Sequence, residues 1–363
     1  MKKKVKVLHI INWLNYGGAE NFLLNLLENL NDNIHNVIIV RNENNPMAKK
    51  FLELGVEVII APSFPKNIIR NYNFMKNYIL NHGSEFSTVH IYANSLIYTF
   101  PIKLFKKYAP NTKVLLHSHS SQSTKKIITR IHNFNRKKYN DLIDFKVACS
   151  YLAGKWMFAD NQFQTIYNGI DVDKFKFREN SRNNIRKSIG ANGETIIIGL
   201  VGRLTPVKNH IFAIKILETL ISKNSNYRLL VVGTGELEKK LKKEVKEKGL
   251  DNFVIFTGSK NNVNEYLCAM DIYIQPSLFE GFPFSVIEAE ISNLPVLMSD
   301  KITTEVIISD IVSVLPLENI SAWSNKIMHT NLNKNRTDLS KVRINKVDIS
   351  SIAKEFEKLY LDI

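Results

Sequence analysis

The chain has 363 residues, 44% of them hydrophobic, which is enough for two domains of roughly 170 residues with separate cores. Its net charge of +15 predicts attraction to phosphorylated substrates, to an anionic membrane surface or to another polyanion. No apolar run approaches the ~18 residues of a membrane span, and Cys149 and Cys268 lack metal-binding spacing. These features exclude a membrane-spanning chain and a disulfide- or zinc-stabilised one. We expect reduced cysteines in a cytoplasmic protein that can attach peripherally to the inner face of the cell membrane.

The first half of the chain alternates apolar runs with helical spacers. A strand over 5–12 is followed by Gly17 and Gly18 and by an amphipathic helix over 21–30. Adjacent glycines at a helix start allow a substrate to approach the backbone closely, although a tight turn explains them equally simply. Further strands are expected at 36–40, 56–60, 88–92, 113–116 and 144–149. This alternation predicts a doubly wound, parallel α/β sheet with ligands at the carboxyl ends of its strands.

Two histidines, His117 and His119, follow the strand expected at 113–116. A single histidine there would more often be structural, but two at alternate positions beyond a strand end also suit a binding site. The sequence leaves both interpretations open.

A basic segment occupies the same half of the chain. Residues 86–140 contain ten Lys and Arg residues and no Asp or Glu. The basic residues from 103 to 138 alternate with apolar ones such as Phe105, Ile131 and Phe134. The segment is therefore either a solvated surface or a basic amphipathic surface that rests on anionic lipid.

The first domain is expected to end near residue 172, after an Asn168-Gly169 turn signal. A polar linker is expected at 173–193. Asp171 and Asp173 form a pattern that can bind a divalent metal, but their place at a domain junction argues against this function.

The second domain, over 194–348, begins with a buried strand at 195–201. Arg203 and Lys208 follow it and bracket a helix start, an arrangement suited to two phosphates, although both could be ordinary surface charges. The strand at 227–232 precedes Gly233 and Gly235, which alone are weak evidence for a phosphate loop. Further strands are expected at 253–257 and 295–298, and a helix over 349–361 closes the chain.

The most informative stretch begins with the apolar run at 272–275. It breaks at Pro276, carries Glu280 in a loop and resumes as a helix that contains Glu288. Helix N-terminal amides suit phosphate and carboxylates suit sugar hydroxyls, so this stretch suits a nucleotide sugar.

Taken in order, these motifs resemble the retaining glycosyltransferases of the GT-B fold, family 4 (group 1), over nearly the whole chain. The segment Ser299-Asp300-Lys301-Ile302-Thr303-Thr304-Glu305 resembles the capsular and exopolysaccharide branch of that family. The resemblance implies two Rossmann-like domains with parallel sheets that face each other across a cleft. It also implies a C-terminal helix, here 349–363, that completes an acceptor-binding first domain over 1–172, while the second domain binds the nucleotide sugar.

The resemblance also assigns roles to residues. Arg203 and Lys208 would hold the donor diphosphate, Glu288 the ribose, and Glu280 would lie beside the donor sugar, with His119 reaching the sugar from the first domain. The other donor-binding positions it implies are Gly17, Gly18, Gly233, Gly235, Gly281 and Phe282.

The expected activity is transfer of a sugar, with retention, from a nucleotide diphosphate, UDP in the first instance, to a polyprenyl-diphosphate-linked glycan. Arg203 and Lys208 would stabilise the departing diphosphate, so no metal or other cofactor is expected. The spacing of the two carboxylates argues against a hydrolase. Two alternatives are a nucleotide-sugar epimerase on the same fold and a basic nucleic-acid-binding protein, although no nucleic-acid-binding motif is present.

Overall fold

The computed structural model describes residues 5–15, 17–120, 123, 125–159, 162–280, 282–332, 336–340 and 342–361. Its contacts divide the chain into two compact units, Met1–Asp171 with Asn345–Ile363, and Val172–Ile344. Each unit is built on one parallel sheet, of seven described strands in the first and six in the second. The α/β class with parallel sheets predicted from the sequence is confirmed.

The sheet of the first unit is doubly wound. Its order is β3-β2-β1-β4-β5-β6-β7, so the chain starts near the centre and reverses its winding direction between β1 and β4. The carboxyl ends of all these strands therefore meet at one edge. The strands are β1 (Val5–Ile11), β2 (Ile34–Val40), β3 (Glu57–Ile60), β4 (Thr88–Ala93), β5 (Lys113–Ser118), β6 (Phe145–Ala148) and β7 (Gln164–Thr165).

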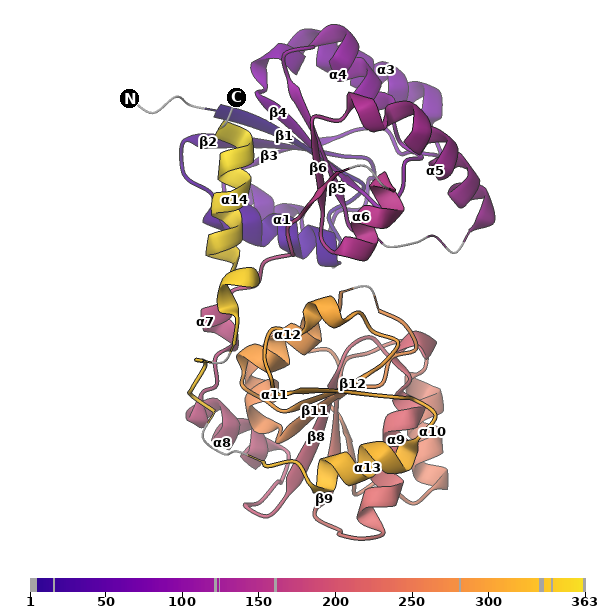
Figure 1. Ribbon diagram of the computed structural model, residues 1–363, viewed down its shortest axis with the longest axis vertical. Coiled ribbons are helices and arrows are strands. Elements are labelled where there is room, and N and C mark those ends of the chain that lie inside the picture. The colour runs from indigo at the N-terminus through magenta and orange to yellow at the C-terminus, as the bar shows by residue number, and fades with distance from the viewer. Residues whose placement is uncertain are drawn as a thin grey trace. The chain divides into compact units, whose positions relative to one another are not determined.

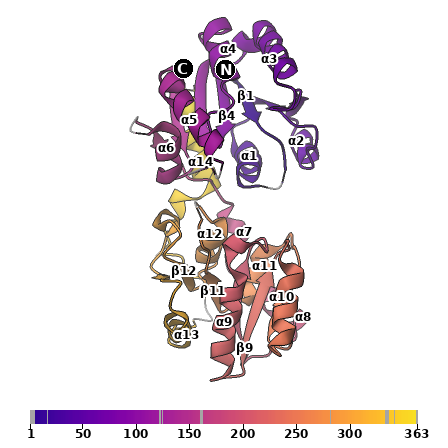
Figure 2. The same ribbon diagram turned by 90° about the vertical axis from the view of Figure 1, so that its right-hand side faces the viewer.

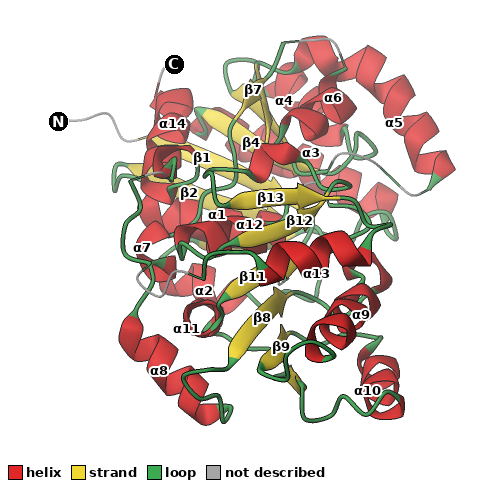
Figure 3. Cartoon of the chain, turned by 60° about the horizontal axis from the view of Figure 1, so that its bottom comes forward, coloured by secondary structure: helices red, strands yellow, loops and turns green. Residues whose placement is uncertain are grey.

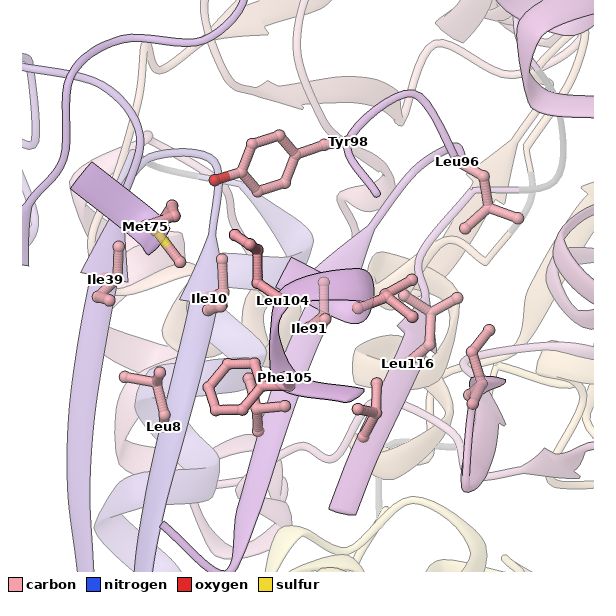
Figure 4. Close-up of a cluster of buried hydrophobic side chains, with 14 of the residues drawn as sticks. Leu8, Ile10, Ile39, Met75, Ile91, Leu96, Tyr98, Leu104, Phe105 and Leu116 are labelled. Carbon is pink, nitrogen blue, oxygen red and sulfur yellow. The ribbon is translucent and has the colours of Figure 1, made fainter. Parts of the chain in front are cut away.

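Helices cover both faces of this sheet. Successive strand residues point to opposite faces, so Leu8 and Ile10 pack with Ile39 and Ile91 in the core cluster on one face (Figure 4). Phe105 of α4 closes this cluster. The helices are α1 (Gly18–Asn29), α2 (Ala48–Glu53), α3 (Ile68–His82), α4 (Phe100–Tyr108), α5 (Lys126–Tyr139), α6 (Tyr151–Phe158) and α14 (Ile349–Leu361).

The C-terminal helix α14 packs on the other face, beside α1 and β1 (Figure 1). Ile349, Ile352, Phe356 and Tyr360 recur at helical spacing and are all buried. The helix predicted over 349–361 is confirmed, and its apolar stripe explains why it docks on the sheet of the first unit.

The sheet of the second unit has the order β10-β9-β8-β11-β12-β13, and Figure 3 shows β13, β12, β11, β8 and β9 in succession. Helices α9 and α13 pack together over one face, where Phe212 and Trp323 meet (Figure 2). The strands are β8 (Ile196–Val201), β9 (Tyr227–Val232), β10 (Val254–Phe256), β11 (Ile272–Gln275), β12 (Val296–Ser299) and β13 (Val312–Leu315). The helices are α7 (Val172–Phe175), α8 (Glu179–Ser188), α9 (His210–Ile221), α10 (Glu238–Glu247), α11 (Val263–Ala269), α12 (Phe284–Ile291) and α13 (Ile320–Met328).

The range 173–193, expected to be a linker, differs from that prediction because it carries α7 and α8. Arg182 and Arg186 of α8 are buried and bind the two carboxylate oxygens of Asp271 at 2.5 and 3.0 Å. The polar composition of this range is typical of a loop, but its arginine charges are paired inside the fold. At the junction, Asp173 pairs with Lys176 at 2.6 Å.

Within the described ranges, Cys149 and Cys268 are buried thiols that are not joined in a disulfide. Among the described residues, no helix combines the length and the apolar character needed to cross a membrane.

Candidate active site

The loop after β8 forms one wall of the candidate site. Gly202 has a φ of 154°, and a Cβ there would lie 3.0 Å from Cε of Lys208. The chain continues through the exposed Arg203 and a short 3-10 turn, Pro206–Lys208, into α9. Arg203 and Gly233 line a cavity of about 510 Å³ at the carboxyl ends of β8 and β9. This is the edge at which doubly wound sheets bind ligands.

Gly233 and Gly235 hold the next loop against this wall. A Cβ at Gly233 would lie 2.0 Å from the carbonyl oxygen of Gly202, and one at Gly235 would lie 2.5 Å from that of Leu204. Glycine is therefore required at both positions by loop packing. At these two positions the cavity wall is consequently main chain, while donor binding by Gly233 and Gly235 remains a prediction.

Glu280 is the centre of the polar network. Lys208 Nζ donates to its Oε1 at 2.7 Å and to its Oε2 at 3.0 Å. Gln275 Nε2 and Ser277 Oγ each donate to Oε1 at 2.6 Å. The Glu280 side chain is only 14% exposed and that of Lys208 only 18%. Three donor side chains, one of which is the positively charged Lys208, fix one orientation of this carboxylate.

Gln275 and Ser277 were not identified from the sequence. Gln275 accepts hydrogen bonds from the Tyr273 and Ser285 hydroxyls, so its amide is oriented with Nε2 towards Glu280. Positions 273, 275 and 277 alternate along β11 and its extension, which places them on one face of the strand. Polar residues at alternate positions of an otherwise apolar strand were the available signal.

Two loops bring Lys208 and Glu280 together. The backbone N–H of Leu278 donates to the carbonyl of Val207 at 2.8 Å, and Glu280 forms an isolated parallel bridge with Ile302. Residues 72 positions apart therefore meet at the same sheet edge.

Glu288 lies on α12, near enough to Lys208 for the lysine charge to affect the pKa of its carboxyl. Burial raises the pKa of the Glu288 carboxyl to about 7, against the opposing effects of Lys174 and Lys208. The neighbouring Glu290 is fully buried, and this burial raises the pKa of its carboxyl to about 7. Glu290 accepts hydrogen bonds from the Ile308 amide and the Ser309 hydroxyl. Glu290 thus has an internal structural role, whereas Glu288 keeps partial exposure.

Phe282 packs edge-on against Phe284, with ring centroids 5.8 Å apart. Gly281 lies outside the described residues. Their predicted donor contacts stay predictions.

The first unit carries the remaining predicted residues. Gly17 precedes α1 with extended backbone, and Gly18 begins the helix. A Cβ at Gly17 would lie 2.4 Å from a carboxylate oxygen of Glu20, so the glycine makes room for this side chain.

His119 follows β5, and both of its ring nitrogens are buried without a hydrogen-bond partner. Burial lowers the pKa of His119 to about 3, so the imidazole is neutral at physiological pH. His117 is fully buried instead, with Nδ1 3.2 Å from Nε2 of His90. Of the two histidines, His117 belongs to an internal cluster and His119 lines a cavity.

The structure thus brings Lys208, Glu280, Gln275 and Ser277 into one network, and Arg203 lines the adjoining cavity with the glycines. His119, Gly17 and Gly18 belong to the first unit.

The chain is similar in sequence to known glycosyltransferases. Residues 181–342 match the family described as Glycosyl transferases group 1. The chain is 29% identical over 345 residues to the Bacillus subtilis (strain 168) protein named as glycosyltransferase EpsF, covering 89% of this chain and 86% of that one. It is 23% identical over 378 residues to the Escherichia coli UDP-Gal:alpha-D-GlcNAc-diphosphoundecaprenol alpha-1,3-galactosyltransferase, covering 99% and 97%.

Among solved structures, Anabaena Alr3699/HepE in complex with UDP superposes with a TM-score of 0.81 at 16% identity, covering 99% of this chain and 100% of that one. At this identity the likeness establishes the fold. The Bacillus subtilis and Escherichia coli relatives are named as transferases, so the epimerase alternative has no support. The chain is a glycosyltransferase of the GT-B fold, and its residues 181–342 match the family described as Glycosyl transferases group 1.

Proposed function

We propose that the chain is a retaining glycosyltransferase that moves a sugar from UDP to a polyprenyl-diphosphate-linked oligosaccharide during capsule, exopolysaccharide or O-antigen synthesis. The observation that carries this proposal is the Lys208–Glu280 pair at the ligand-binding edge of the second unit. In this pair, Lys208 can bind a diphosphate, and the adjacent carboxylate of Glu280 can accept hydrogen bonds from sugar hydroxyls. The names of the Escherichia coli relative and of the Anabaena complex, which mention UDP-Gal and UDP, support UDP as the nucleotide.

Arg203 and Lys208 would stabilise the negative charge that develops on the departing diphosphate. Lys208 has three N–H donors, so it can keep Glu280 and still donate to a phosphate oxygen. These fixed cations fill the role that a divalent metal has in other transferases, and we propose that the reaction needs none.

Glu288 would accept hydrogen bonds from the ribose hydroxyls, and Glu280 would orient the donor sugar. Hydrogen bonds donated by the ribose hydroxyls would favour the ionised carboxylate, and would therefore lower the pKa of Glu288 from its raised value. The main chain at Gly17, Gly18, Gly233 and Gly235, with Gly281 and Phe282, would complete the donor site, and His119 would contribute a neutral imidazole.

Retention follows if the acceptor hydroxyl attacks from the face that the diphosphate leaves. The bond from the anomeric carbon to the diphosphate oxygen breaks, and the bond to the acceptor oxygen forms. The acceptor proton passes to the departing diphosphate oxygen. Glu280 then orients and stabilises the sugar and does not form a covalent intermediate.

Helix α5 is the proposed contact with an anionic membrane on the cytoplasmic side. Ile127, Ile131 and Phe134 lie on one side of this helix and are 61, 42 and 68% exposed. Exposed basic residues accompany them at Lys126, Arg130, Lys137 and Lys138. Apolar residues flanked by cations suit insertion among anionic headgroups.

Part of the basic segment has structural partners instead. Lys106 pairs with Asp144 at 2.6 Å, and Arg136 donates to the carbonyl of Trp156 at 2.9 Å. The proposed membrane surface is therefore α5 with its exposed charges, a smaller area than the whole range 103–138.

Calorimetry with UDP, followed by UDP release from UDP-sugars with and without extracted lipid acceptors, tests the proposed function. We expect UDP binding and acceptor-dependent release. Absence of binding to any nucleotide of a broad panel, together with no release, would overturn the proposal. Release or sugar interconversion that needs no acceptor would point to a different enzyme.

A further inference from the structure

A second cavity, of about 380 Å³, lies in the first unit at the carboxyl edge of its sheet. Its lining includes residues from the loops that follow four strands: Trp13 after β1, Arg41 after β2, Asn94 after β4 and His119 after β5. This edge contains the reversal of winding between β1 and β4, the usual ligand position in doubly wound sheets.

Arg41 supplies the positive charge of this cavity. Its guanidinium carbon lies 3.8 Å from the ring centroid of Tyr98 and 5.6 Å from that of Phe64. Burial lowers the pKa of Arg41 to about 10, so the group remains charged at neutral pH. Aromatic rings stabilise a guanidinium but satisfy few of its five N–H donors. Indeed Nε is buried and has no hydrogen-bond partner.

The acidic residue of the cavity does not neutralise this charge. Glu20 receives hydrogen bonds from its own backbone and from Trp13, and burial raises its pKa. Within the described part of the chain, Arg41 forms no ion pair. A partly buried cation without an anion is costly, and its cost falls when a ligand brings the missing charge.

His119 is the second polar side chain in this cavity without a partner. It is a neutral imidazole whose two ring nitrogens are both free to donate or accept. Its ring stacks on Tyr92, with centroids 5.5 Å apart, which fixes its plane.

We infer that the cavity of the first unit binds an oxyanion of the acceptor, a phosphate or a carboxylate, with Arg41 as its cation and one of the two ring nitrogens of His119 as a hydrogen-bonding partner. The inference deepens the proposed function and rests on it for the identity of the ligand as the acceptor. The oxyanion has two possible sources, the diphosphate of the lipid carrier and a uronic acid of the glycan.

The test is calorimetric titration with pyrophosphate, phosphate, glucuronate and glucose. The Arg203→Gln chain serves as the parent, because this change weakens the proposed diphosphate site of the second unit. We expect the parent to bind pyrophosphate or glucuronate more tightly than glucose. Adding Arg41→Gln should weaken that binding about tenfold or more, and Arg41→Lys should weaken it less. Preference for pyrophosphate identifies the lipid diphosphate as the source, and preference for glucuronate identifies a uronic acid.

Equal anion affinity with and without Arg41→Gln, or no anion binding by the parent, would overturn the inference. A direct measurement on the otherwise unaltered chain guards against misfolding of the variants. The NMR resonance of the Arg41 Nε–H, assigned with Arg41→Lys, should shift on saturation with the preferred anion, and an unchanged resonance would count against the site.

UDP affinity is measured separately in the chain that carries only Arg41→Gln, and should stay within about twofold of the original because Arg41 is not one of the proposed donor-binding residues. Failure of the original chain to bind UDP would remove the proposed function, while the anion titrations would still decide the role of Arg41.

Discussion

Two polar clusters, one in each unit, are in opposite electrostatic states. In the first, His9, His90 and His117 lie under α14, where burial lowers the histidine pKa values and raises that of Tyr360. In the second, Lys208 and Glu280 face each other as a cation and a carboxylate.

Neutral groups can satisfy one another inside a core at small cost, as His90 and Tyr360 do at 2.7 Å. Buried charges need counter-charges, and a site that holds them near solvent can exchange one partner for a ligand. The histidine cluster therefore fastens α14 to its sheet, whereas the Lys208–Glu280 pair is the part suited to chemistry.

The largest effect is expected for Glu280→Gln. Turnover should fall on the order of 10²-fold, because the sugar loses the carboxylate that orients it. UDP affinity should stay equal or increase, since Lys208 is released from its partner. Steady-state UDP release and UDP calorimetry measure the two quantities, with Glu238→Gln on α10 as the control. Undiminished turnover would place the chemistry elsewhere.

Lys208→Ala should weaken UDP binding by about 10- to 100-fold, the range for a lost charge-assisted hydrogen bond of about 1.5–3 kcal/mol. The matched control is Lys215→Ala on the same helix region, where the side chain is exposed. Similar calorimetric affinities for both variants would show that the diphosphate does not contact Lys208.

The first unit should be less stable to unfolding at acid pH. Because burial lowers the pKa of His9 to about 4, the unfolded state binds more protons below pH 6.5, and stability falls as the pH drops from 6.5 towards 4. His9 contributes up to about 2 kcal/mol of this loss by pH 5.

Hydrogen exchange of the β1 and β4 amides at pH 7 and pH 5, corrected for the intrinsic rate, measures this loss. His9→Gln should reduce the pH dependence, and His35→Gln, at an exposed position of β2, should not. Protection that does not change with pH would contradict the assignment of a buried neutral cluster.

Phe134→Ser should reduce binding to vesicles that contain anionic lipid by about 3- to 30-fold, since a large exposed apolar side chain contributes roughly 1–2 kcal/mol on insertion. Leu52→Ser on α2, 57% exposed in the same unit, is the control. Vesicle co-sedimentation at two salt concentrations provides the measurement. Equal loss for both variants would remove α5 from the membrane proposal.

The smallest effect is expected for metal removal. Chelation with EDTA should leave UDP release unchanged within about twofold, because Arg203 and Lys208 supply the positive charge. A loss of activity that Mg²⁺ or Mn²⁺ restores would show that the cations of the chain are insufficient.

The sequence predicted the main strands well, since buried parallel strands are continuous apolar runs, as at 227–232, which is β9. It did not predict β7 or β13, because a two-residue strand and a half-exposed edge strand lack that pattern. It also assigned 173–193 to a linker, because buried arginines paired with Asp271 have the same composition as a solvated segment.

The sequence by itself determined the class of fold and the motif residues Arg203, Lys208, Glu280 and Glu288, because spacing along one strand, loop and helix is local information. Only the tertiary structure decided which partner each polar group meets. It pairs Lys208 with Glu280, 72 positions away, and gives Glu290 a hydrogen bond from Ser309. It buries His117 in the core and places His119 at a cavity. It also left Arg41 among aromatic rings without an anion. Such contacts depend on loops that meet at a sheet edge, and no local spacing encodes that meeting.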